Sequence, residues 1–270
     1  MGTTVGLVGA GRMGMPMVGH LVRKGFSVLV YDIDADKRRG VEACGARWAG
    51  SLEALARSCA IVLLCVGYDR DIRALLASDG PLSAAPRDTV IAILSTIHPQ
   101  SVKELAGQSA PRGHVVVDAT VCRGGRAADD GTLLAFVGGP SAAVERLRPV
   151  LGAFASDIVH TGDVGTAQVA KAVNNLIMWA CLVANHEGLA LAQRYGLDVE
   201  MLRKSLLTST AANAPLANWG KQSMAWAEDD MAIVAEMAEE SGISLPQAGL
   251  VRELCRSLKP RRYRLDEYGT

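Results

Sequence analysis

Near the start of the chain stands the stretch Thr4-Val-Gly-Leu-Val-Gly-Ala-Gly-Arg-Met-Gly14, from which the architecture can be inferred. A short apolar run leads directly into a GxGxxG pattern, and a helix-length stretch from Met15 to Lys24 follows it. After a strand, the first glycine permits a tight turn, the second lets backbone approach a pyrophosphate, and the third lets the helix pack on the strand. The free N–H groups at the start of the following helix favour the binding of phosphate groups. The stretch predicts a dinucleotide site; the alternative is a tight turn that binds nothing.

An acidic residue follows the second expected strand, Ser27–Tyr31. Asp32 stands where a carboxylate accepts hydrogen bonds from ribose hydroxyls and repels a 2′-phosphate, which favours NAD over NADP. Arg38 and Arg39 follow and leave NADP possible, and the alternative for Asp32 is a cap or turn residue. The predicted cofactor-binding residues are Gly9, Gly11, Arg12, Met13, Gly14, Asp32, Val66, Gly67, Asp71 and Thr96.

Short apolar runs alternate with helix-length stretches through the first part of the chain. Such alternation is typical of a doubly wound parallel sheet covered on both faces. From Gly165 the pattern becomes helical, and Gly165–Tyr195 would be about 45 Å long as one helix. We predict an α/β fold with a Rossmann-like domain over 1–163 and an all-α domain over 164–270, joined by a long helix. The expected strands are Thr4–Val8, Ser27–Tyr31, Ala60–Val66, Thr89–Leu94, His114–Val121 and Leu133–Val137, and the later helices are Val199–Thr208, Asp229–Ser241 and Pro246–Ser257.

Composition excludes several classes of protein. The 270 residues hold 28 Lys and Arg against 28 Asp and Glu, so the basic face of a nucleic-acid binder is not expected. The longest apolar run, Leu176–Ala184, is about half a membrane span, and the apolar N-terminal run lacks the basic region of a signal peptide. The six cysteines show no zinc spacing. We expect a cytoplasmic protein that binds no nucleic acid, no membrane and no metal.

Four stretches together carry a family resemblance. They are the Gly9–Gly14 turn; Ser95-Thr-Ile-His-Pro99; Asp118-Ala-Thr-Val-Cys-Arg-Gly124 with Gly131-Thr-Leu133; and Gly162-xx-Gly165-x-Ala167-xxx-Lys171-xxx-Asn175. The chain resembles, over nearly its whole length, the β-hydroxyacid dehydrogenases around 3-hydroxyisobutyrate dehydrogenase and tartronate semialdehyde reductase. The resemblance implies an NAD(P)-dependent oxidoreductase that interconverts a small anionic 3-hydroxyacid and its semialdehyde. It also implies a homodimer or higher homo-oligomer, which would cover the apolar circumference of the long helix.

Lys171, Asn174, Asn175 and Met178 fall on one face of the expected long helix. Hydride transfer to a carbonyl leaves an alkoxide that needs a proton, and an ammonium group supplies it. The two amides can grip the same oxygen. The resemblance gives Lys171 the acid–base role and Asn175 that of orienting partner. The alternative is a solvated lysine with two ordinary amides.

The expected substrate loop departs from the family pattern, which reads Asp-Ala-Pro-Val-Ser-Gly-Gly. Arg123 replaces a glycine and adds a guanidinium suited to a carboxylate, sulfonate or phosphonate, so the loop also resembles the sulfolactaldehyde reductase branch. Arg123 and Lys171 would then form a positive pocket on a neutral protein. The alternatives are that Arg123 points to solvent or pairs with Asp129 or Asp130. The predicted substrate-binding residues are Ser95, Cys122, Arg123, Gly124 and Asn174.

The helical half departs further from the family. Asp229 stands where a late lysine is usual, and the segment from Lys221 to Trp226 is short. We therefore expect a pocket that is less enclosed, or one closed by Trp219, Trp226 or a partner subunit. An imine reductase-like enzyme and a catalytically weak dinucleotide-binding scaffold are the alternative functions, and Lys171 weighs against both. The sequence leaves open the exact substrate, the direction of reaction and the size of the oligomer.

Overall fold

The computed structural model describes residues 3–261 and 263–268. The chain divides into two compact units, Met1–Lys171 and Ala172–Thr270. The division falls inside one continuous helix, α8 (Thr166–Arg194), so the two units share a helix instead of a linker.

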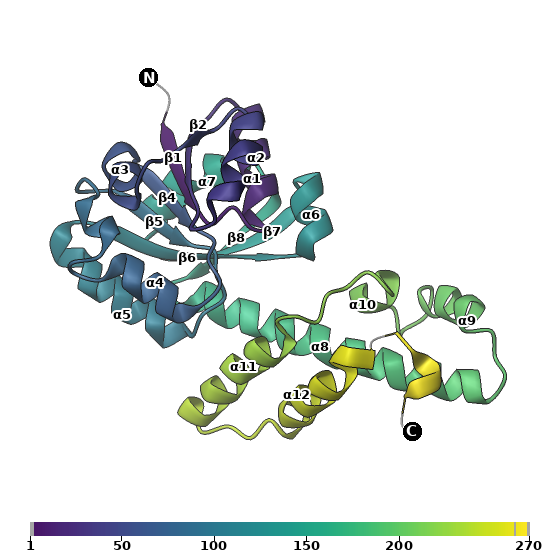
Figure 1. Cartoon of the computed structure of the whole chain (residues 1–270). Helices are drawn as coiled ribbons and strands as arrows, with labels where there is room; N and C mark the ends of the chain where they lie inside the picture. Colours follow the sequence, from purple (N-terminus) through teal and green to yellow (C-terminus); the bar gives the residue numbers. More distant parts are fainter. Residues whose placement is uncertain (1–2, 262, 269–270) are drawn as a thin grey trace. The chain divides into compact units, whose positions relative to one another are not determined.

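The first unit is built on an eight-stranded sheet with the order β3-β2-β1-β4-β5-β6-β7-β8 (Figure 1). Neighbouring strands run parallel except β6 and β7, which are antiparallel. The strands are β1 (Thr4–Val8), β2 (Ser27–Tyr31), β3 (Arg47–Trp48), β4 (Ile61–Leu64), β5 (Val90–Ile93), β6 (Val115–Cys122), β7 (Leu133–Gly138) and β8 (Ala155–Gly162).

All six expected strands are present, and three features of the sheet were not predicted. β7 is antiparallel to β6 because the connection between them holds only the short α6 (Gly124–Asp130), and a parallel crossover needs about a dozen residues or more. β3 has only two residues. β8 is largely exposed, so it lacks the apolar run by which the inner strands were recognised.

Helices cover both faces of the sheet, as predicted for a doubly wound fold. Side chains of successive strand residues alternate between two cores, so that Leu7 and Leu63 lie in one and Val8 and Leu64 in the other. The first core also takes residues from α1, α2, α6 and α7, and the second takes residues from α3, α4 and α5. These helices are α1 (Gly14–Arg23), α2 (Arg38–Ala43), α3 (Leu52–Ser58), α4 (Asp69–Leu76), α5 (Pro99–Ser109), α6 and α7 (Ser141–Leu151).

The second unit is helical. The expected long helix is α8, and its end is confirmed at Gly196, which has φ 78°. The Leu197 N–H donates to the Ala192 carbonyl, closing a Schellman motif, and Asp198 then caps the next helix by accepting from the Met201 N–H. The later helices are α9 (Val199–Leu206), the unpredicted α10 (Ala214–Ala217), α11 (Ala227–Ser241) and α12 (Pro246–Leu258).

The part of α8 in the second unit has one buried face and one exposed face. Trp179 and Leu182 pack against residues of α11 and α12, and the Trp179 indole donates to Asp230 at 2.9 Å. Within the described residues, α8 alone is long and apolar enough to cross a membrane by length and composition, a test that core helices of soluble proteins also pass. The expectation of no membrane contact stays a prediction.

Candidate active site

The glycine-rich turn joins β1 to α1 at the carboxyl edge of the parallel strands. Gly9 has φ 98°, and a Cβ there would collide with the Cys65 carbonyl, while a Cβ on Gly14 would collide with the Gly9 carbonyl. A Cβ on Gly11 would meet nothing within 4 Å, so the backbone is open at that point. The turn therefore has the shape that a pyrophosphate requires, tight at two glycines and accessible at the one between them.

Asp32 lies beside this turn and is buried, with 8% of the residue exposed. It accepts hydrogen bonds from the Ala10 N–H at 2.7 Å and the Asp34 N–H at 2.9 Å, and from the Lys37 ammonium at 3.0 and 3.1 Å. Burial alone would raise the pKa of Asp32, but these hydrogen bonds outweigh it and lower the pKa below its usual value. The partner Lys37 was not predicted; its place five residues after Asp32 is the signal that was available.

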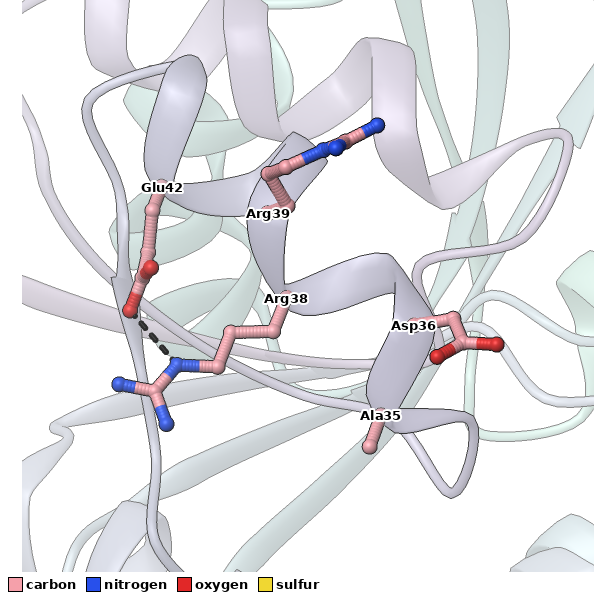
Figure 2. Close-up of a pocket in the computed structure, with 5 residues that line it drawn as sticks. All are labelled: Ala35, Asp36, Arg38, Arg39 and Glu42. Atoms are coloured by element: carbon pink, nitrogen blue, oxygen red, sulfur yellow. Dashed lines mark hydrogen bonds and ion pairs between the residues drawn. The ribbon is translucent and has the colours of Figure 1, made fainter.

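The two predicted arginines differ in their surroundings (Figure 2). The Arg38 guanidinium donates to Glu42 at 2.8 Å on one side of α2, whereas Arg39 extends to the other side and has no ion pair with any described residue. With Asp36, these side chains line a shallow hollow after β2. Of the three cations in residues 35–42, only Arg38 is paired with Glu42, whereas Lys37 and Arg39 are not.

Arg12, inside the glycine-rich turn, forms a bidentate ion pair with Asp129 of α6 at 2.7 and 2.6 Å. The hydrogen bond from Arg12 lowers the pKa of Asp129. Met13 packs against the first core, and a Cβ on Gly125 would meet the Arg12 guanidinium. The turn is therefore attached to the helix that follows the expected substrate loop.

Ser95 follows β5 and is buried, with a hydroxyl that is already engaged. It donates to the Val66 carbonyl at 2.8 Å and accepts from the Val66 N–H at 3.1 Å. The side chain thus fixes the segment Val66–Gly67 after β4, whereas the sequence assigned it to substrate. The predicted cofactor-binding residue Thr96 is half-buried beside Ser95. Another predicted cofactor-binding residue, Asp71, lies in the first turn of α4, where its carboxylate is 3.7 Å from the Arg70 guanidinium.

Lys171 is on α8, and its side chain contacts the end of β6. Its ammonium donates to the Val121 carbonyl at 2.8 Å and lies 4.0 Å from the Cys122 sulfur. Further along α8, Asn175 is buried and accepts from the Asn174 side chain at 3.0 Å. The structure thus brings Lys171 directly to the expected substrate loop.

The structure gives Arg123 a partner that the sequence did not suggest. Its guanidinium donates to Asp157 at 2.7 Å, to the Ser156 hydroxyl at 2.8 Å and to the Thr132 carbonyl at 3.0 Å. The alternatives Asp129 and Asp130 are instead paired with Arg12 and Arg126. Asp157 was missed because β8, which carries it, was not recognised as a strand.

The backbone of this loop is left-handed at two successive residues. Arg123 has φ 83° and Gly124 has φ 76°. A residue other than glycine rarely adopts this conformation, so the three contacts of the guanidinium help to hold the turn between β6 and α6.

The start of α8 is held by buried polar groups that were not among the predicted site residues. Asp118 of β6 accepts from the Gly165 N–H at 2.8 Å and from the Gln168 N–H at 3.0 Å, and Thr120 donates to the Ala167 carbonyl at 3.0 Å. Burial raises the pKa of Asp118, against the opposing effect of these backbone hydrogen bonds. The available signal was that Asp118 opens the quoted loop motif and Gln168 lies inside the Lys171 motif.

In the helical unit, Asp229 is exposed in the first turn of α11. Trp226 just before it is 48% exposed, whereas Trp219 packs against the His186 ring at a centroid distance of 4.5 Å. Trp219 is therefore part of a cluster inside this unit.

Comparisons with known proteins agree with this geometry. Residues 4–162 match the family model of the NAD-binding domain of 6-phosphogluconate dehydrogenase, and residues 165–267 match that of the NAD-binding region of NADP-dependent 3-hydroxyisobutyrate dehydrogenase. The 3-hydroxyisobutyrate dehydrogenase of Pseudomonas aeruginosa is 32% identical over 78% of this chain and 71% of its own. This chain belongs to the β-hydroxyacid dehydrogenase family.

Solved structures support the same assignment. The 3-hydroxyisobutyrate dehydrogenase of Mycobacterium tuberculosis, solved with L-serine, has a TM-score of 0.87 at 25% identity, covering 97% of this chain and 95% of its own. An imine reductase of Myxococcus stipitatus has a TM-score of 0.70 at 19% identity over 97% of this chain and 95% of its own, which shows the shared fold alone. As a β-hydroxyacid dehydrogenase, the protein is an NAD(P)-dependent oxidoreductase acting on hydroxyacids.

Proposed function

We propose that this β-hydroxyacid dehydrogenase interconverts a small anionic 3-hydroxyacid, or its sulfonate analogue, and the corresponding semialdehyde, with Lys171 as the general acid and base. The observation that carries the proposal is the 2.8 Å hydrogen bond from the Lys171 ammonium to the Val121 carbonyl. It holds a proton donor next to Cys122–Gly124, in the unit that also contains the glycine-rich turn.

The chemistry of Lys171 follows from its hydrogen bonds. An ammonium has three N–H donors; one binds the Val121 carbonyl and one makes a weak contact with the Cys122 sulfur, which leaves the third for a substrate oxygen. The bound nicotinamide supplies or accepts the hydride. In reduction Lys171 gives a proton to the developing alkoxide, and in oxidation the neutral amine takes the hydroxyl proton. Asn175 lies one turn further along the same helix, and we retain it as the orienting partner.

Recognition of the anionic end of the substrate is assigned to Cys122, Arg123 and Gly124. In the structure Nη1 of the Arg123 guanidinium is bound to Asp157, so a carboxylate or sulfonate either takes the place of Asp157 or shares the guanidinium with it. Both groups are about half exposed, so water can solvate Asp157 after the exchange. Ser95 contributes through the segment that it fixes, because its hydroxyl is used by Val66.

We further propose that NAD is the preferred cofactor, since the Asp32 carboxylate follows β2 beside the glycine-rich turn, where ribose hydroxyls would share it with the Lys37 ammonium that it already binds. The Lys37 ammonium offsets the charge of Asp32, which weakens its repulsion of a 2′-phosphate. We therefore expect use of NADPH as well, with a higher KM.

We also propose that a second copy of this chain covers the exposed face of α8. This face carries large apolar side chains at Val173, Ile177, Leu191 and Tyr195, which are 49%, 59%, 61% and 79% exposed. Ala184 and Gly188 continue it with small residues that let another helix approach closely. An apolar stripe of this length on an otherwise well-packed helix is typical of a protein interface.

The test is turnover by the purified protein, read at 340 nm, with a panel of 3-hydroxyacids and matched neutral alcohols and aldehydes. Lys171→Ala should lower kcat by about 10²–10⁴-fold and leave the Kd for NADH within about twofold. Lys171→Arg is the matched control, because it keeps the positive charge but does not release a proton at neutral pH. A Lys171→Ala variant with nearly unchanged kcat would contradict the acid–base role.

A further inference from the structure

Gln168 is a buried polar side chain that the reaction proposed above does not use. It lies in the first turn of α8, three residues before Lys171, and is 1% exposed. A buried amide without partners is costly, so the groups that satisfy it indicate what it does.

The Gln168 amide binds the main chain on both sides of Thr96. Its Nε2 donates to the Ser95 carbonyl at 2.8 Å, and its Oε1 accepts from the Ile97 N–H at 3.1 Å. One side chain thus gives this loop the pair of hydrogen bonds that a neighbouring strand would give. The loop that follows β5 is thereby joined to the first turn of α8.

The same turn of α8 is attached to β6. Asp118 accepts from the Gln168 N–H at 3.0 Å, and Lys171, one turn later, donates to Val121 at 2.8 Å. In the other direction, Ser95 holds Val66 through its hydroxyl. A continuous series of hydrogen bonds thus runs from the segment after β4, through the loop after β5 and Gln168, to the segment that holds Lys171.

We propose that Gln168 is a positioning residue that sets the loop Ser95–Ile97, which carries the predicted cofactor-binding residue Thr96, relative to the Lys171 ammonium. The proposal rests on the function proposed above. Hydride transfer needs the donor carbon, the substrate carbon and the proton donor in one near-attack arrangement, and small displacements are costly in rate. Gln168 touches none of the reacting atoms, so it acts on kcat through the loop and Lys171.

The chemistry of the link suggests a specific test. The Ser95 carbonyl can only accept and the Ile97 N–H can only donate, so the bridging group must present one donor and one acceptor. An amide does so, a protonated carboxyl group also does so, and a carboxylate does not. In Gln168→Glu the ionised carboxylate should therefore lose the hydrogen bond to the Ser95 carbonyl, and the protonated carboxyl group should restore it. Burial favours the protonated form.

The experiment measures kcat, on the best substrate of the panel, for wild type, Gln168→Glu and Gln168→Leu between pH 8 and 6. We expect the ratio of Gln168→Glu to wild-type kcat to be lowered on the order of tenfold to a hundredfold at pH 8 and to rise about tenfold by pH 6. Gln168→Leu should be slow at every pH, with the Kd for NADH near that of wild type.

Two controls separate this effect from other titrations. The titratable groups on the elements around position 168 include Asp118, His98, Lys103, Asp163 and Lys171, and they are common to wild type and variants, so the ratio removes them. Gln108→Glu, on an exposed part of α5, places the same new carboxyl away from the link and should give a ratio that does not change with pH.

Hydrogen exchange at the Ile97 amide gives a readout that needs no substrate. In Gln168→Glu, protection of this amide should be lost at pH 8 and return by pH 6. A pH-independent kcat ratio for Gln168→Glu, or full activity of Gln168→Leu, would overturn the positioning role. The proposed function would still stand in that case, provided that the wild type turns over a hydroxyacid. If wild type turns over no hydroxyacid, the proposed function fails separately, and unchanged protection of Ile97 in Gln168→Glu overturns the link itself.

Discussion

The Arg123 guanidinium, just after β6, donates a 2.7 Å hydrogen bond to the carboxylate of Asp157 on β8, and β7 lies between these two strands in the sheet. The hydrogen bonds from Ser156 and then Arg123 lower the pKa of Asp157, so the carboxylate stays charged at neutral pH. A substrate anion that binds Arg123 therefore competes with an internal anion for the positive charge of the guanidinium.

This competition predicts opposite effects of two substitutions. Asp157→Asn removes the competing charge and should lower the KM for anionic substrates severalfold, whereas Arg123→Gly should raise it about tenfold or more. Neither should change the KM for a neutral aldehyde. If both substitutions leave the KM for anions unchanged, the guanidinium only supports the left-handed turn.

The ion pair between Asp32 and Lys37 predicts how the protein selects its cofactor. Lys37→Ala leaves the buried Asp32 carboxylate without its cation, so the KM for NADPH should rise about tenfold while that for NADH changes little. Arg38→Ala is the matched control, because Arg38 is already bound to Glu42. Equal changes in KM for both cofactors in Lys37→Ala would show that Lys37 supports the turn alone.

A buried histidine predicts the pH dependence of stability in the helical unit. His186 accepts from the Tyr263 N–H at 3.1 Å, and burial lowers its pKa although its hydrogen bond to Leu182 opposes this. An unfolded histidine protonates near pH 6.5, so below that pH the unfolded state binds the extra proton first and the free energy of unfolding falls.

Between pH 7.5 and 5.5 the Tm of wild type should therefore fall by about 2–4 °C more than that of His186→Gln, which does not titrate. His160→Gln, at an exposed position of β8 in the other unit, removes a histidine outside this cluster and should keep the wild-type slope. Parallel curves for wild type and His186→Gln would exclude His186 as the source.

The exposed face of α8 predicts the oligomeric state. Ile177→Lys places a charge within the apolar stripe and should convert a dimer or larger oligomer into monomer in sedimentation velocity at micromolar concentration. Leu250→Lys, on α12 and 60% exposed, is the matched control and should leave the sedimentation coefficient unchanged. A wild-type monomer at this concentration would contradict the proposed assembly.

Much of the fold was predictable because the inner strands and the long helix carry strong local patterns. The six expected strands are short runs rich in Val, Ile, Leu and Ala. The end of α8 is marked by the backbone of Gly196 and by the side chain of Asp198, which caps the next helix. β8 was not predicted because it is an edge strand that exposes polar residues. The antiparallel direction of β7 was not predicted because it depends on the length of its connection to β6, which a strand's own residues do not show.

The candidate site was predictable only where a motif names its residues. The meeting of Lys171 with the Cys122 loop was expected from the motifs. The pairing of Arg123 with Asp157, and the use of the Ser95 hydroxyl by Val66, depend on contacts between residues distant in sequence. Periodicity and spacing carry no information about such contacts, and Gln168 was passed over for the same reason.

The continuity of α8 has a consequence for protein engineering. A chain ended at Lys171 would stop within a helical turn and leave carbonyl groups of that turn without their partners. Grafting a relative's helical half onto this nucleotide-binding half therefore means splicing inside a helix in register, where an insertion or deletion of one residue rotates everything beyond it by about 100°. Recombination between relatives is thus expected to succeed only when it preserves the residue count of this helix.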